Sequence, residues 1–217
     1  LHLSLRRQRQ MCIRDSDYAA CEAAVERIGK ARSIYIGGFG ASAWLAGLLQ
    51  HGLDSSCSDV RLLSGVSGVT HAARTLMHAG PQDVFIGVTF PRYLTDTIAL
   101  AQIARGQGCA VLALTDRPSS PLAPLADVAL YCQTETSYRP NCETSVLALI
   151  EALTSAVALR APGAVQSAGR ILQAVRPWLH GGNGPRTNGT NGTNGANGAN
   201  PQVTLPADST PKKKTSR

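Results

Sequence analysis

Two loops of this 217-residue chain carry residues suited to binding an anion. The first loop, residues 37–43, has three glycines around Phe39 and a hydroxyl at Ser42. Glycines let backbone N–H groups approach an anion closely, and a helix that follows such a loop adds the positive end of its dipole. We therefore predict that Gly38, Gly40 and Ser42 contact an anionic group of a ligand.

The second loop, residues 89–97, combines threonine hydroxyls with a fixed positive charge. A guanidinium such as that of Arg92 matches the bidentate geometry of phosphate and carboxylate groups. We predict ligand contacts from Thr89, Arg92, Tyr93 and Thr95. The alternative is a plain helix start, in which Thr95 is a cap and Arg92 is solvated.

The sequence gives less support to a dinucleotide site or a metal site. Residues 38–43 also fit the G-x-G-x-x-A dinucleotide pattern, but that site wants an acidic residue at the end of the second strand, and Asp59 lies at its beginning. The cysteines form no C-x-x-C pair and have no histidine at metal-ligand spacing. We therefore predict no cofactor, no metal and reduced thiols at Cys12, Cys21, Cys57, Cys109, Cys132 and Cys142.

Apolar strand-like runs alternate with helical patterns along the chain, which predicts βαβ units and a parallel sheet. The runs are continuously apolar, as expected for strands covered on both faces. The predicted fold is α/β, a flavodoxin-like three-layer α/β/α sandwich with a five-stranded parallel sheet. We expect strands over 33–36, 59–63, 83–89, 110–114 and 127–132, and helices over 17–31 (capped by Ser16), 41–50 (stopping at Gly52), 70–78, 94–105, 143–160 and 163–178.

Both chain ends differ from the middle. Residues 1–16 have no apolar periodicity and are interpreted as a non-native or disordered segment, or as a basic arm; residues 181–217 are an Asn/Gly/Thr-rich tail with a basic end, predicted to be disordered. Residues 17–180, the predicted domain, hold 12 basic and 12 acidic side chains and so lack a basic footprint for nucleic acid. No apolar run is long enough to span a membrane, and a cytoplasmic location is expected.

Three stretches, residues 34–42, 83–93 and 113–127, resemble in order and spacing the SIS (sugar isomerase) domain of RpiR/MurR-family transcriptional regulators. The likeness spans about residues 18–178. It implies a phosphosugar ligand held by Ser42 and the loop from Thr89 to Thr97, a homodimer or higher oligomer, and DNA binding through an N-terminal helix-turn-helix domain, for which nothing before Asp17 is long enough. One departure is Pro91-Arg92-Tyr93, which replaces the small residues of many SIS phosphate loops.

The predicted function is a ligand-sensing domain that binds a sugar phosphate or an acidic sugar and has no catalytic residue. The alternative is a sugar-phosphate aldose–ketose isomerase, which needs a general base. The ligand loops contain no Glu or His; Glu143 or His71 could reach a site formed with a second subunit, but no spacing argues for it. A purely structural dimer module is a third reading, since Leu147, Ile150 and Leu153 form a stripe that suits either an interface or the core.

Overall fold

The computed structural model describes residues 18–65, 67–136, 141–161 and 164–178. The predictions for residues 1–16, for the Ser16 cap, for Cys12 and for the tail from 181 onward lie outside these residues. The chain divides into two compact units, the first ending at Val175. Of the second, only the 3-10 turn η2 (Arg176–Trp178) is described.

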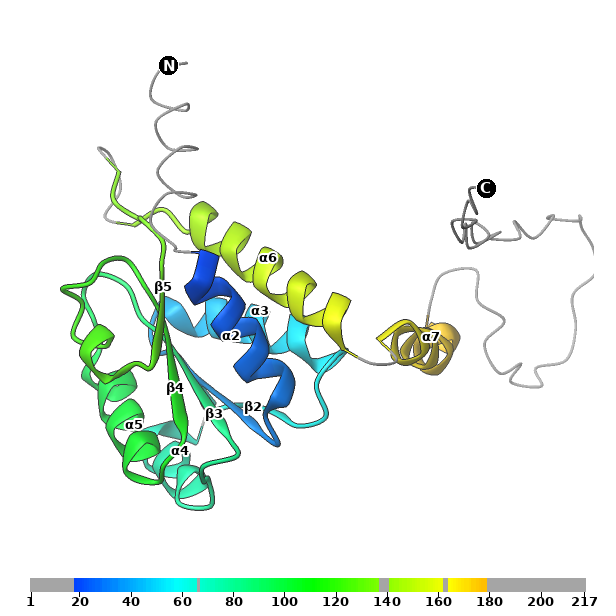
Figure 1. Cartoon of the computed structure of the whole chain (residues 1–217), viewed down its shortest axis with the longest axis horizontal. Coiled ribbons are helices and arrows are strands. Elements are labelled where there is room, and N and C mark those ends of the chain that lie inside the picture. Colours follow the sequence, from blue (N-terminus) through cyan, green and yellow to red (C-terminus); the bar gives the residue numbers. More distant parts are fainter. Residues whose placement is uncertain (1–17, 66, 137–140, 162–163, 179–217) are drawn as a thin grey trace, which may run out of the picture. The chain divides into compact units, whose positions relative to one another are not determined.

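Strands and helices alternate as the apolar pattern predicts (Figure 1). The strands are short and largely buried because helices lie on both sides of them. In chain order the elements are α2 (Tyr18–Lys30), β1 (Ile34–Gly37), α3 (Ser42–Asp54), β2 (Val60–Leu62), α4 (Gly68–Leu76), β3 (Val84–Val88), α5 (Thr95–Gly106), β4 (Ala110–Thr115), η1 (Ala123–Leu125), β5 (Val128–Tyr131), α6 (Thr144–Arg160) and α7 (Ala164–Val175).

The five strands form one sheet in the order β2-β1-β3-β4-β5, and every pairing is parallel. The predicted three-layer α/β/α fold is thereby confirmed. Strand β1 pairs with β3 from Ile34 opposite Val84 to Gly37 opposite Gly87. The loops that leave these two strands therefore start side by side at the carboxyl edge of the sheet.

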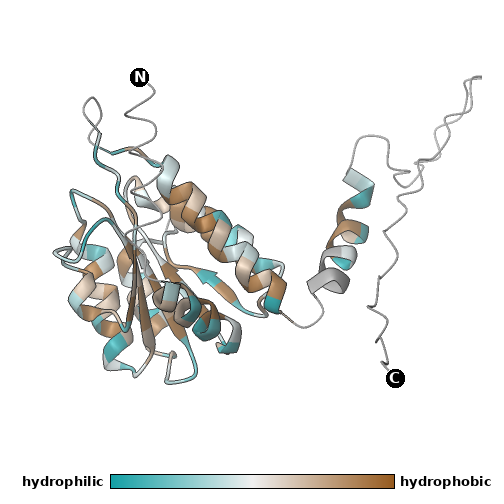
Figure 2. Ribbon diagram, turned by 45° about the horizontal axis from the view of Figure 1, so that its top comes forward, coloured by the Kyte–Doolittle hydropathy of each residue, from teal (hydrophilic) through white to brown (hydrophobic). Residues whose placement is uncertain are grey.

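Each face of the sheet has its own apolar core. Alternate strand residues such as Ile34 and Ile36 pack with α2, α3 and α6, whereas Tyr35 and Phe85 pack with α4 and α5 on the other face (Figure 1). Figure 2 shows the hydrophobic strands enclosed between helices that carry hydrophilic residues on their outer faces. Successive residues of a strand belong to different cores because their side chains point to opposite faces of the sheet.

The stripe on α6 is mostly core. Ile150 and Leu153 are buried, and only Leu147 is substantially exposed. Cys109 and Cys132 are buried, as predicted, Cys21, Cys57 and Cys142 are half-buried, and none of these five described cysteines is in a disulfide. None of the described helices is long and apolar enough to cross a membrane.

Several helix boundaries differ from the sequence prediction: α4 lies two residues earlier than expected, α7 ends at Val175 rather than at residue 178, and the end of α3 has a packing reason. Helix α3 does not stop at Gly52 but continues to Asp54. A Cβ atom at Gly52 would lie 2.6 Å from Cγ2 and 2.9 Å from Cβ of Thr154 on α6. Gly52 therefore serves the close approach of two helices, a role that a helix-stop pattern does not distinguish.

This packing predicts opposite effects for two glycines of the same helix. Gly52→Ala should lower the free energy of unfolding by about 1–3 kcal/mol, because the stiff Thr154 side chain cannot move aside. Gly47→Ala should raise it by about 0.5–1 kcal/mol, because alanine favours the helix and a Cβ there would make only an ordinary contact, 4.0 Å from Cδ2 of Leu62. Urea denaturation measures both, and equal effects at the two positions would contradict the packing role of Gly52.

Candidate functional site

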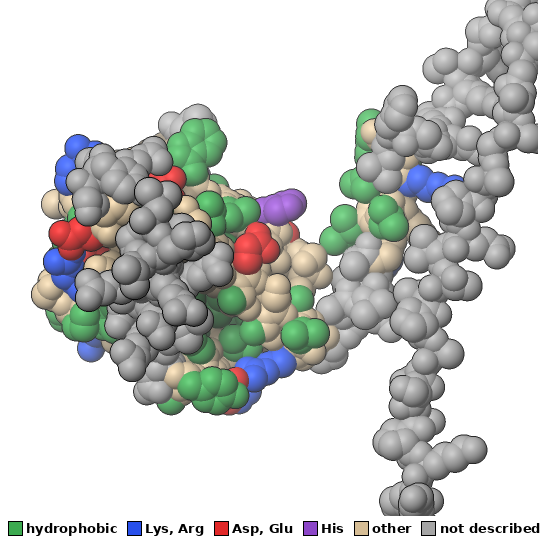
Figure 3. Space-filling view, turned by 90° about the horizontal axis from the view of Figure 1, so that it is seen from above, with side chains coloured by type: hydrophobic (Ala, Val, Ile, Leu, Met, Phe, Trp, Pro, Cys, Tyr) green, Lys and Arg blue, Asp and Glu red, His purple; other side chains and the backbone are tan. Residues whose placement is uncertain are grey.

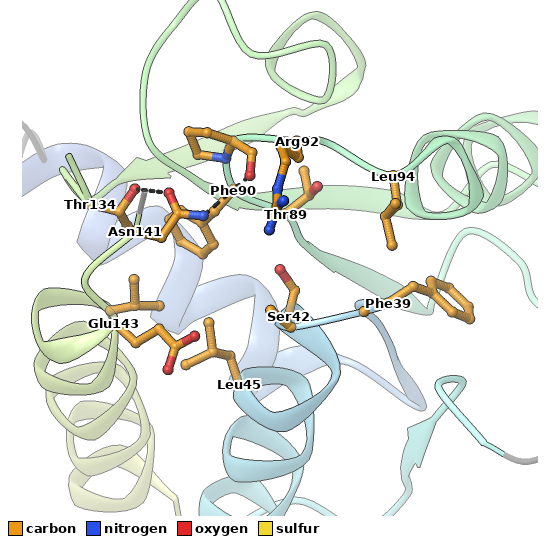
Figure 4. A pocket seen from close by; sticks show the side chains of 14 residues that line it. Phe39, Ser42, Leu45, Thr89, Phe90, Arg92, Leu94, Thr134, Asn141 and Glu143 are labelled. Atoms are coloured by element: carbon orange, nitrogen blue, oxygen red, sulfur yellow. Dashed lines mark hydrogen bonds between the residues drawn. The ribbon is translucent and has the colours of Figure 1, made fainter. Parts of the chain in front are cut away.

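A cavity of about 360 Å³ opens at the carboxyl edge of the sheet, where ligands of parallel α/β sheets bind (Figure 4). Three connections contribute to its lining: the β1–α3 loop, the β3–α5 loop and, between β5 and α6, the described residues Thr134, Asn141 and Glu143. It is lined by Phe39, Gly40, Ala41, Ser42, Leu45, Thr89, Phe90, Pro91, Arg92, Leu94, Thr134, Asn141, Glu143 and Val146.

Two hydroxyl groups of this cavity have no partner among the described residues. Ser42, the first residue of α3, is 9% exposed, and Thr89, which follows β3, is 3% exposed. Some other buried hydroxyls are paired, as that of Thr115, which lies 2.7 Å from Oγ of Ser120, whereas that of Thr97 on α5 has no partner among the described residues. The hydroxyls of Ser42 and Thr89 differ from that of Thr97 because their residues line the cavity, so they are available to a ligand.

Backbone amides add donors at the start of α3. The amides of Ser42 and Ala43 donate to the carbonyl oxygens of Phe39 and Gly40, at 3.2 and 3.1 Å. Those of Gly40 and Ala41 have no such partner in the described part of the chain, and both residues line the cavity. The positive end of a 13-residue helix thus lies beside the Ser42 hydroxyl, an arrangement that favours an anion.

Arg92 supplies the positive charge of the cavity. Figure 4 shows its side chain extending toward Ser42. Among the described residues it forms neither an ion pair nor a hydrogen bond, whereas most of the other described arginines have protein partners. The paired ones include Arg32, Arg61, Arg105, Arg117 and Arg160.

The backbone of Arg92 is left-handed, with φ of 65°. This conformation costs a residue other than glycine about 1–2 kcal/mol, so the surroundings must enforce it. Both neighbours are anchored. The carbonyl of Pro91 accepts a hydrogen bond of 3.2 Å from Nδ2 of Asn141, and the hydroxyl of Tyr93 donates one of 2.6 Å to Oδ1 of Asp116.

These anchors are themselves held in place. The hydroxyl of Thr134 lies 3.2 Å from Oδ1 of Asn141, and the Asp116 carboxylate, only 2% exposed, also accepts from Arg117. Burial and the hydrogen bond to Asp116 raise the pKa of Tyr93 to about 12, so its hydroxyl remains a donor at neutral pH. Asp116 thus holds Tyr93 in place.

The predicted ligand residues divide into two groups. Gly40, Ser42, Thr89 and Arg92 line the cavity, and Gly38, Tyr93 and Thr95 do not. The side chain of Tyr93 is bonded to Asp116, and Gly38 and Thr95 also lie outside the lining.

Gly38 is needed for close packing, since a Cβ there would lie 2.8 Å from the Ser42 carbonyl oxygen and 3.1 Å from that of Val88. Its amide donates to Oγ of Ser64 at 3.0 Å. Thr95 is an exposed residue at the start of α5, where it makes no side-chain cap bond.

Sequence reasoning missed the third wall. Thr134, Asn141 and Glu143 come from the segment between β5 and α6, and Glu143 extends into the cavity beside Leu45 (Figure 4). The rule that places ligands after the strands applies to β5 as well, and its use there would have found these residues. His71, by contrast, is an exposed residue of α4 outside the cavity lining.

Metal-ligand geometry is not found in the described residues, where no three His, Cys, Asp or Glu side chains form a group that could hold an ion. The acid that argued against a dinucleotide, Asp59, accepts hydrogen bonds from Ser33 and Arg61 near the start of the strands, away from this cavity. The cavity chemistry is therefore that of hydroxyls, amides, one guanidinium and one carboxylate.

The model of the SIS domain family matches residues 27–160. The sugar isomerase domain of an RpiR transcription factor from Sphaerobacter thermophilus is 31% identical, with a TM-score of 0.70 over 77% of this chain and 93% of that one. The chain belongs to the SIS domain family, with the RpiR type among its relatives.

Other SIS-type structures share the fold at lower identity. Vibrio vulnificus NanR, solved in complex with ManNAc-6P, is 20% identical with a TM-score of 0.69 over 82% of this chain and 69% of that one. The phosphoheptose isomerase GmhA of Neisseria gonorrhoeae is 18% identical, with a TM-score of 0.59 over 72% of this chain and 95% of that one. The same SIS fold thus occurs in regulators and in enzymes.

The left-handed backbone of Arg92 leads to a stability prediction. Arg92→Gly should be more stable than Arg92→Ala by about 1 kcal/mol, because glycine adopts positive φ without strain. At Arg74, in the right-handed helix α4, the order should reverse by a similar amount. Urea denaturation of the four variants tests this, and an alanine variant as stable as the glycine variant at position 92 would refute the strain.

Proposed function

We propose that this SIS domain binds a sugar that carries a phosphate or another acidic group. The anion lies between Arg92, the hydroxyls of Ser42 and Thr89, and the amides of Gly40 and Ala41. The observation that carries the proposal is that the hydroxyls of the buried residues Ser42 and Thr89 and the guanidinium of Arg92 line one cavity and have no partner among the described residues. The ManNAc-6P complex of Vibrio vulnificus NanR supports a phosphosugar as the ligand class.

We further propose that binding serves sensing rather than catalysis, and that the domain belongs to a cytoplasmic transcription regulator. Its 31% identity to the RpiR domain supports this role. DNA contact is assigned to a separate helix-turn-helix domain, because residues 17–180 carry equal numbers of basic and acidic side chains. On the face seen in Figure 3, both signs of charge are interspersed.

A homodimer or larger assembly is proposed, and light scattering coupled to gel filtration tests it.

Ligand binding is tested by isothermal titration against a panel of hexose and N-acetylhexosamine phosphates. Ser42→Ala and Arg92→Ala should each weaken the best ligand by about ten- to a hundredfold, as expected for hydrogen bonds to a charged group. The control variants Ser119→Ala and Arg74→Ala change exposed residues of the same types outside the cavity and should bind as the wild type does. Unchanged affinity in both cavity variants would place the ligand elsewhere.

A second candidate function, aldose–ketose isomerisation, is favoured by one observation. The Glu143 carboxylate lies in the cavity, where a general base could move a proton between adjacent carbons of a sugar. Proton NMR of the panel in D₂O with the protein present distinguishes the two functions. A sensor should leave the C1 and C2 protons unexchanged, whereas exchange that Glu143→Gln abolishes would establish the isomerase.

A further inference from the structure

We propose that Glu143 makes this cavity select sugars with a single anionic group and a hydroxyl or amino group at the far end, and exclude sugars with a second acid. This inference rests on the proposed function, since it concerns the same cavity. It assigns to Glu143 a specificity role that is separate from holding the anion.

The Glu143 carboxylate has no protein partner in the described part of the chain. Glu143 occupies the N-cap position of α6, yet its side chain makes no cap hydrogen bond. Most of the other described acids are engaged. The partnered ones are Glu22, Glu26, Asp59, Asp83, Asp116, Asp127 and Glu135.

The surroundings of Glu143 set it apart from the anion-binding end. Figure 4 shows its carboxylate beside Leu45, whereas Arg92 and Ser42 approach each other farther along the cavity. Glu143 and Arg92 form no ion pair, so neither charge satisfies the other. A ligand that fills the cavity meets a guanidinium at one end and a carboxylate at the other.

This pair of charges discriminates in two ways. A hydroxyl or ammonium group can donate a hydrogen bond to Glu143, and such a bond to a charged acceptor is among the stronger ones. A second phosphate or carboxylate would instead face a like charge, and juxtaposed like charges are an established means of rejecting wrong ligands. The side chain beside the Glu143 carboxylate, that of Leu45, is apolar and offers no compensating donor.

The test uses Glu143→Gln, which removes the charge and keeps the size and an acceptor oxygen. Glu151→Gln is the matched control, because Glu151 is an exposed residue of the same helix outside the cavity lining. Isothermal titration compares three ligands: a hexose 6-phosphate, its 2-amino-2-deoxy analogue and the hexose 1,6-bisphosphate. Circular dichroism verifies that each variant is folded.

We expect the wild type and Glu151→Gln to prefer the amino sugar over the hexose phosphate, and the hexose phosphate over the bisphosphate. Glu143→Gln should reduce at least one of these preferences by about tenfold, as expected for the loss of one close charge interaction. Both preferences staying within about threefold of the wild type, with the hexose phosphate still bound, would overturn this inference alone. A wild type that binds none of the three ligands would overturn the proposed function and this inference together.

Discussion

The parallel pairing of β1 with β3 at the centre of the sheet is the constraint on which the site depends. The two strands are separated in sequence by α3, β2 and α4 but adjacent in the sheet, so that the loops carrying Ser42 and Thr89 begin at neighbouring points. Gly38 keeps this junction tight, because a side chain there would collide with the carbonyl oxygens of Ser42 and Val88. The hydroxyls are therefore positioned by backbone packing that is complete without any ligand.

The layers and the parallel pairing follow from sequence patterns, since continuously apolar strands separated by helices permit few other folds. Local departures depend on tertiary contacts that periodicity does not encode. Gly52 was predicted to stop the helix, whereas the structure shows that it lies against Thr154. The sequence alone does not distinguish a glycine that ends a helix from one that allows two helices to pack closely. From the sequence, the stripe that includes Ile150 and Leu153 could belong either to an interface or to the core. In the structure α6 packs on α3, and both residues lie in the core.

The candidate site was only partly predictable, for a similar reason. Residues with free donors next to a strand end, such as Ser42 and Arg92, are recognisable from type and position. Tyr93 also carries a donor next to a strand end, yet its hydroxyl donates to Asp116. Asp116 lies 23 residues away, and sequence spacing does not reveal this contact. Glu143 was considered only for a site shared with a second subunit, because it follows the last strand after a longer connection and because a glutamate at a helix start usually needs no function beyond the helix dipole.

The Pro-Arg-Tyr segment shows how a loop can depart from a small-residue phosphate loop and keep an open cavity. Pro91 supplies a carbonyl that Asn141 binds, and Tyr93 supplies a hydroxyl that Asp116 binds. Held from both sides, Arg92 adopts a backbone conformation that its own side chain disfavours. A small-residue loop binds an anion mainly through backbone amides. The bulkier residues of this loop leave fewer amides accessible, and the loop instead offers a guanidinium in a defined direction. The strain at Arg92 is thus offset by contacts outside the cavity, which leaves its charge for the ligand.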